Sequence, residues 1–171
     1  FLLHVDEINR ADLSKVLGEA IFLLEVDEPF RAVHLAHDFG EPVHQELRIP
    51  ANLHLLGTMN SADRSIAILD LAIRRRFAFV RLWPQAKVVK AHAGGICQEA
   101  FERLFSIFLE FAPEEAFDLM PGHGYFLAPD EVAGPVLATG VAPLLQEYLK
   151  QGYVAGFADE IRAYLDWLES Q

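Results

Sequence analysis

Three short apolar runs along the chain end abruptly, and each predicts a buried strand. Residues 1–5 stop at Asp6-Glu7, and residues 53–59 stop at Asn60. Runs of this length with an abrupt polar end are typical of parallel strands covered on both faces. Residues 77–82 alternate and are rich in aromatic side chains, which predicts a third strand.

Between these strands the apolar spacing changes to that of helices. Asp12 can cap a helix whose apolar positions (13, 16, 17, 20, 21 and 24) form one stripe. Ser61 or Asp63 can cap a second helix, from about residue 65 to 75. Residues 29–52 carry three prolines and a glycine between short apolar stretches, which predicts a hairpin-like insertion with a turn near residues 38–40.

The pattern of apolar residues changes again at Trp83-Pro84, and the residues after this boundary predict no further long buried strand. Helices are predicted at residues 98–111, 141–150 and 158–168, with a turn and a short extended piece at 121–126. The element order predicts an α/β fold with a parallel sheet over residues 1–83. A smaller helical part follows over residues 84–171.

The composition is that of a globular protein and narrows the function classes. Of 171 residues, 52% are hydrophobic, and 14 Lys and Arg against 25 Asp and Glu give a net charge of −11. This acidic balance argues against a general nucleic-acid coat, although a local basic patch remains possible. One cysteine, Cys97, excludes a disulfide framework and a multi-thiolate zinc site, and favours a reducing, cytoplasmic compartment. No apolar run reaches the length that spans a membrane.

Polar side chains at the ends of two predicted strands are the first candidates for chemistry. Ligands of open parallel sheets bind at the carboxyl edge of the strands. There, Asp6 can hold a hydrated Mg²⁺ on a nucleotide, and Glu7 can polarise an attacking water. Asn60 can orient water or a phosphate without repelling these carboxylates. The alternatives are solvated acids for the first pair and a helix cap for Asn60.

Three consecutive arginines, Arg74, Arg75 and Arg76, close the second predicted helix. They can complement the helix dipole, form a nucleic-acid patch, or stabilise charge on a transferred phosphoryl group as arginine fingers. A helix over residues 65–75 is roughly 15 Å long at 1.5 Å per residue, so its far end hardly reaches a phosphate beside Asn60. If these arginines act on a nucleotide, they serve the site of a neighbouring subunit in a ring.

The histidines and the cysteine give weaker signals. His34, His37 and His44 have no cysteine or close carboxylate to complete a zinc site, and residues three apart in an extended segment face opposite sides. Cys97 lacks a neighbouring catalytic signature and is expected to be a buried small side chain.

Four ordered motifs together resemble those of McrB-type AAA+ proteins. Residues 6–15 (DEINRADLSK) resemble the Walker B region, and residues 58–65 (TMNSADRS) are similar to the Asn-Thr-Ala-Asp-Arg signature with Ser61 in place of Thr. Residues 73–77 (IRRRF) resemble the arginine-finger segment. Residues 122–126 (GHGYF) resemble a lid-domain motif with Gly124 in place of Ser.

The resemblance implies a ring-forming, Mg²⁺-dependent AAA+ nucleoside triphosphatase with a P-loop fold and a helical lid. It implies GTP or ATP as substrate, a homo-oligomeric ring (hexameric in the full-length protein), a McrC-like nuclease subunit as partner, and DNA contacted indirectly through the whole complex. It assigns Mg²⁺ coordination through water to Asp6, water activation to Glu7, γ-phosphate sensing to Asn60, and the trans fingers to Arg75 and Arg76. Asp63 and Arg64 belong to the nucleotide-binding signature without a specified role, and His123 and Tyr125 lie in the lid without assignable chemistry.

One family feature is absent from these residues: no Gly-x-x-x-x-Gly-Lys phosphate-binding loop occurs. Without its backbone amides and lysine a triphosphate loses its main cradle. We therefore expect this chain alone to neither bind nor hydrolyse nucleotide appreciably, and we expect it to be the C-terminal portion of a longer motor. Two alternatives stay open: a MoxR-like subunit that remodels proteins with ATP, and a non-enzymatic assembly module.

Overall fold

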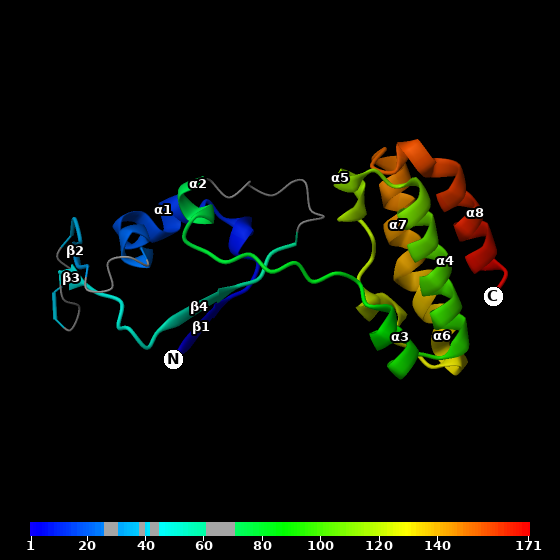
Figure 1. The fold of residues 1–171 in the computed structure, drawn as a ribbon, viewed down its shortest axis with the longest axis horizontal. Helices are drawn as coiled ribbons and strands as arrows, with labels where there is room; N and C mark the ends of the chain where they lie inside the picture. Colours follow the sequence, from blue (N-terminus) through cyan, green and yellow to red (C-terminus); the bar gives the residue numbers. More distant parts are fainter. Residues whose placement is uncertain (26–30, 38–39, 42–44, 61–70) are drawn as a thin grey trace. The chain divides into compact units, whose positions relative to one another are not determined.

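A computed structural model describes residues 1–25, 31–37, 40–41, 45–60 and 71–171. The chain divides into two compact units, Phe1–Val80 and Arg81–Gln171 (Figure 1). Trp83, where the sequence pattern changes, packs edge-on against Phe117 of the second unit, with ring centroids 5.4 Å apart. The two units are described separately below.

The first unit contains a small parallel sheet. Strand β1 (Leu2–Val5) pairs with β4 (His54–Gly57) in a register that runs from Leu2 opposite His54 to Val5 opposite Gly57 (Figure 1). This pairing confirms the first two predicted strands and their parallel direction. Because the two strands run parallel, their carboxyl ends lie at the same edge of the sheet.

The third predicted strand, at residues 77–82, does not form. The segment is irregular, and Val80 and Leu82 are 81% and 87% exposed. A strand needs a neighbour that satisfies its backbone hydrogen bonds, and the described sheet offers none to this segment because it consists of β1 and β4 alone. The chain therefore has mixed α/β character with a two-stranded, not three-stranded, parallel sheet.

The first predicted helix begins where expected but breaks after five residues. Asp12 caps α1 (Leu13–Leu17), its Oδ1 accepting a hydrogen bond from the Lys15 backbone N–H at 3.3 Å. Gly18 then takes a positive φ of 50°, and the chain continues as the 3₁₀ helix η2 (Gly18–Leu24). The apolar stripe predicted one helix, but the glycine ends α1 because it adopts a left-handed φ that other residues avoid.

The predicted hairpin-like insertion is present as a short antiparallel pair, β2 (Val33–His34) with β3 (Glu46–Leu47). Gly40, in the predicted turn, has a φ of 69°, which glycine adopts without steric cost. The helix predicted from residue 65 lies largely outside the described residues. Within the described residues, the short helix α2 (Leu71–Arg74) falls in the predicted range.

The second unit consists of helices. The predictions at 98–111, 141–150 and 158–168 are confirmed by α4 (Gly95–Phe111), α7 (Val141–Lys150) and α8 (Ala158–Glu169). Sequence patterns missed α3 (Ala86–His92) and α6 (Asp130–Thr139), the latter because Gly134 and Pro135 interrupt it. The remaining elements are α5 (Glu114–Phe117), η3 (His123–Phe126) and η4 (Ala155–Phe157).

Helix α4 is the centre of this unit, packing against α3, α6 and α8. Its buried face carries two phenylalanines that meet aromatic rings from other elements: Phe101 contacts Phe126, and Phe108 contacts Phe157, both at 5.3 Å between centroids. Edge-to-face pairs of this kind stabilise a core beyond their buried area. Among the described residues, no helix combines the length and apolarity needed to cross a bilayer.

Candidate functional site

The carboxyl ends of β1 and β4 are tied together by backbone hydrogen bonds. The Thr58 N–H donates to the Val5 carbonyl at 3.0 Å, and the Ile8 N–H donates to the Thr58 carbonyl at 2.8 Å. These bonds extend the parallel ladder one residue beyond β4 and bring Thr58 opposite Asp6. The edge at which ligands of parallel sheets bind therefore carries Asp6 and Glu7 from one strand and Thr58 from the other.

The Thr58 hydroxyl contacts both acidic residues. It donates a hydrogen bond to Asp6 Oδ1, and it accepts one from the Glu7 backbone N–H at 3.1 Å. Sequence reasoning gave Thr58 no role. Its position directly after the second strand, opposite Asp6 in a parallel register, was the signal that could have identified it.

Glu7 has an unusual backbone conformation. Its φ of 50° and ψ of 49° are left-handed, and among the described residues other than glycine no other φ is positive. Such a conformation costs an L-residue on the order of 1 kcal/mol and is concentrated at functional sites. Its carboxylate is half-exposed and pairs with Arg10, Nε to Oε2 at 2.7 Å. The carboxylate thus lies at the surface while the backbone that carries it is held by Thr58.

The turn that follows Glu7 is anchored in the small core of the first unit. Ile8 is buried with Leu13 and Ile73. Its side chain lies directly on Gly57, where an added Cβ would be 2.8 Å from Ile8 Cδ1. Asn9 is 95% buried, and its Oδ1 has no hydrogen-bond partner in the part of the chain that the structure describes.

Asn60, the predicted phosphate sensor, is exposed and follows Thr58 by two residues on the same segment. Asp6, Glu7 and Asn60 therefore follow the ends of the two paired strands, at one sheet edge. Asp63 and Arg64, which belong to the same predicted signature, lie outside the described residues.

The three arginines at the end of α2 have three different surroundings. The guanidinium of Arg74 lies over the Phe79 ring, 5.1 Å from its centroid. The Arg75 side chain is 65% exposed, with Nη2 3.1 Å from Glu25 Oε1. The Arg76 side chain is 3% exposed, bonded to the same Glu25 oxygen and to the Ala72 carbonyl.

These surroundings separate the two predicted fingers. Arg76 stays a predicted finger, and in this structure its guanidinium is enclosed by its own chain. The physical reason is the ion pair with Glu25, which lies about fifty residues earlier and which no local pattern relates to Arg76. Arg75 keeps an accessible guanidinium, and its role as a finger stays a prediction.

The remaining candidates show no assembled site in the described part of the chain. Across the β2–β3 hairpin, His34 Nε2 lies 3.9 Å from Glu46 Oε2, while His44 is outside the described residues. No group of three or more metal-ligating His, Cys, Asp or Glu side chains occurs among the residues searched. Cys97 is fully buried in α4, and this burial raises the pKa of its thiol. His123 Nδ1 accepts a hydrogen bond from the Gln85 N–H at 3.4 Å.

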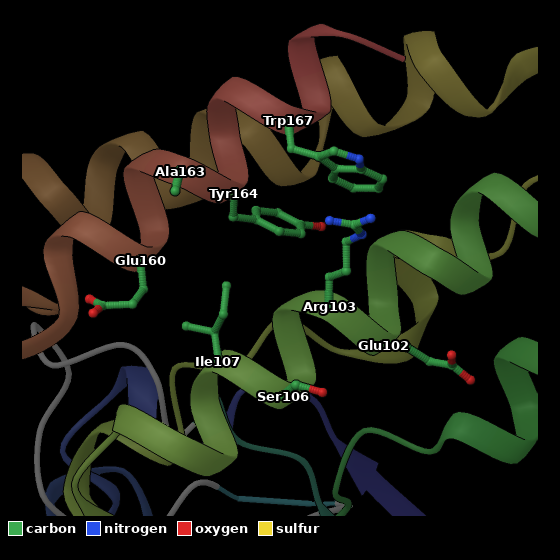
Figure 2. Close-up of a pocket in the computed structure, with 8 residues that line it drawn as sticks. All are labelled: Glu102, Arg103, Ser106, Ile107, Glu160, Ala163, Tyr164 and Trp167. Atoms are coloured by element: carbon green, nitrogen blue, oxygen red, sulfur yellow. The ribbon is translucent and has the colours of Figure 1, made fainter.

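The helical unit has a shallow groove of about 520 Å³ between α4 and α8 (Figure 2). Arg103 of α4 stacks over Trp167 of α8, 4.5 Å from the ring centroid, and pairs with Glu99 at 2.7 Å. Tyr164, beside them, donates its hydroxyl to the Ala100 carbonyl at 3.0 Å. These contacts of Arg103 and Tyr164 hold α8 on α4.

Comparison with known proteins gives two relatives, and no family model matches the chain. The chain is 32% identical over 168 residues to the Type IV methyl-directed restriction enzyme EcoKMcrB subunit of Escherichia coli (strain K12), covering 86% of this chain and 36% of that protein. It is 29% identical over 89 residues to the Type II restriction enzyme BsuMI component YdiS of Bacillus subtilis (strain 168), covering 46% of this chain and 26% of that protein. The chain thus spans about a third of the length of the first relative and about a quarter of the second. This chain is similar to two restriction-enzyme components, and the similarity to the first covers most of the chain. The chain is therefore a McrB-like protein.

Proposed function

We propose that this chain is part of a ring-forming AAA+ nucleoside triphosphatase that serves a McrBC-type restriction system. The observation that carries the proposal is the parallel pairing of β1 with β4, with Asp6 and Glu7 directly after β1 and Asn60 three residues after β4. Both relatives are restriction-enzyme components, which favours this task over ATP-driven protein remodelling.

The donor set at this edge fits a magnesium site. Mg²⁺ prefers carboxylate and water oxygens and keeps much of its hydration shell. The Thr58 hydroxyl donates to one oxygen of Asp6, so the second oxygen remains for the water shell of the ion. When bound, Mg²⁺ neutralises the phosphate charge that otherwise repels an attacking water.

Within this proposal, each residue has a distinct task. Glu7 accepts the proton of the attacking water, because its carboxylate is accessible and next to Asp6. Asn60 donates its amide to the γ-phosphate. Asp63 and Arg64 complete the nucleotide-binding signature, and Arg75 acts on the nucleotide of the neighbouring subunit, the arginine whose exposure fits a trans finger.

The proposal is tested in the full-length protein by measuring GTP and ATP hydrolysis with and without Mg²⁺. Glu7→Gln is expected to abolish hydrolysis and to leave nucleotide binding intact, because the amide cannot accept the proton. Glu110→Gln, at an exposed position on α4 in the other unit, is the matched control. Full activity of Glu7→Gln, or hydrolysis that does not require a divalent cation, would contradict the proposal.

Mixing two inactive variants tests the ring. Subunits carrying Glu7→Gln and subunits carrying Arg75→Ala are expected to regain part of the activity when mixed, since some interfaces then combine an intact Glu7 with an intact Arg75. Arg162→Ala, another exposed arginine, serves as the control. Absence of any recovery across all mixing ratios would remove the trans mechanism.

A further inference from the structure

We infer that Thr58 is a positioning residue that holds Asp6 and Glu7 in a single arrangement through its hydroxyl group. This inference rests on the proposed function, because it assigns the arrangement to nucleotide hydrolysis. Its basis is the set of hydrogen bonds at the end of β4, where every polar group of Thr58 is directed at β1 or the turn that follows it.

All four polar contacts of Thr58 join the two strands. Its N–H and carbonyl continue the ladder, to Val5 at 3.0 Å and from Ile8 at 2.8 Å. Its hydroxyl donates to Asp6 Oδ1 and accepts from the Glu7 N–H at 3.1 Å. Any residue provides the two backbone bonds, whereas the hydroxyl bonds are specific to Thr or Ser.

The two hydroxyl bonds act on groups that need to be fixed. The bond to Asp6 fixes the rotation of the carboxylate and thereby the direction of its free oxygen. The bond from the Glu7 N–H supports a left-handed residue whose conformation is unfavourable by itself. Without the hydroxyl, the Glu7 N–H loses its acceptor, and the turn has less reason to keep this conformation.

Thr58 also precedes Asn60 by two residues on the same segment. A shift of this segment that accompanies contact between Asn60 and a phosphate therefore moves the hydroxyl that holds Asp6 and Glu7. The arrangement connects the predicted sensor to the predicted catalytic carboxylate through one side chain.

The test compares Thr58→Val, Thr58→Ser and Thr139→Val in the full-length protein. Valine keeps the shape and the branched Cβ of threonine but removes the hydroxyl, and serine keeps the hydroxyl. Thr139 is the control because its hydroxyl donates to a carbonyl within its own helix, Pro135 at 2.7 Å, in the other unit. We expect Thr58→Val to lower kcat by between about tenfold and a hundredfold, which is the range for a misplaced catalytic group.

A purely structural role would not give the same pattern. We expect the KM for nucleotide to change little in Thr58→Val, the Mg²⁺ concentration for half-maximal activity to rise, and Thr58→Ser to restore most of kcat. Wild-type kcat and Mg²⁺ dependence in Thr58→Val would overturn the inference while the proposed function stands. If the wild-type protein does not hydrolyse nucleotide, the proposed function fails, and the predicted effect of the Thr58 hydroxyl on kcat fails with it.

Hydrogen exchange on the 171-residue chain decides the positioning contact without any activity. The Glu7 amide is expected to exchange at least about tenfold faster in Thr58→Val than in wild type or Thr58→Ser, because its acceptor is gone. Amides of α4 and α8 report whether each variant is folded. Equal exchange of the Glu7 amide in all three proteins would overturn the inference.

Discussion

The enclosure of Arg76 gives a prediction that tests both the fold and the choice of arginine finger. Glu25→Gln keeps the shape of the side chain and removes its charge. The Arg76 guanidinium, 3% exposed, then loses its counter-charge, while its Nε already has no partner among the described residues. A buried cation left without its carboxylate is destabilising, because the charge is held away from water.

The magnitude follows from the geometry. Two charges about 4 Å apart interact by about 4 kcal/mol at the effective dielectric constant of about 20 that suits protein sites. Glu25 is 27% exposed, so solvent screens part of this interaction. We expect Glu25→Gln to lower the free energy of unfolding of the first unit by about 3 kcal/mol, towards the lower end of the range for broken buried pairs.

Two further variants separate the pair from general packing. Arg75→Met is the matched control: that guanidinium contacts the same Glu25 oxygen but is 65% exposed, so the expected loss is about 0–1 kcal/mol. The double variant Glu25→Gln with Arg76→Met removes both charges. Its loss should be smaller than the sum of the two single losses, because no unpaired charge remains.

The assay has to report on the first unit. Every tryptophan and tyrosine lies after residue 80, so fluorescence follows the helical unit alone. Native-state hydrogen exchange of the β1 and β4 amides, measured as a function of denaturant, gives the required free energy. A loss below about 1 kcal/mol for Glu25→Gln, equal to that of Arg75→Met, would refute the enclosure of Arg76.

Three other predictions concern local geometry. Gly94→Ala should destabilise the helical unit by about 1–3 kcal/mol, because the added Cβ would meet the Asp130 backbone N at 2.5 Å. The control Gly95→Ala, whose added Cβ has its nearest contact at 3.9 Å, should be neutral or stabilising. Tryptophan fluorescence during denaturation measures both variants. Burial raises the pKa of Tyr164, so above about pH 10 the unfolded state releases a proton that the folded state keeps, and the free energy of unfolding should fall as pH rises. Tyr164→Phe should make that fall less steep, which urea unfolding at several alkaline pH values measures. At the left-handed position of Glu7, Glu7→Gly should be more stable than Glu7→Ala by about 1 kcal/mol, the reverse of the usual order, and exchange of the β1 amides checks the sign.

What the sequence predicted well depends on local information. The helices α4, α7 and α8 have continuous amphipathic stripes, which periodicity identified. Strands β1 and β4 are short apolar runs with clear polar ends, which the local sequence identified. The Asp12 cap was equally local, since the side chain and the backbone N–H that donates to it are three residues apart. Failures occurred where one residue overrides the pattern or where a partner is required: Gly18 divides the first helix, and residues 77–82 have no neighbouring strand in the described sheet.

The same distinction between local and long-range information applies to the candidate site. Strand ends are visible in the sequence, so Asp6, Glu7 and Asn60 could be assigned to one edge as soon as two parallel strands were expected. The side-chain contacts around these candidates join positions about fifty residues apart in the sequence: Thr58 with Asp6, and Glu25 with Arg76. A run of three arginines therefore shows where positive charge accumulates, but the burial of each guanidinium decides how strongly it stabilises its own fold. Arg75 keeps an exposed guanidinium, as the proposed trans finger requires.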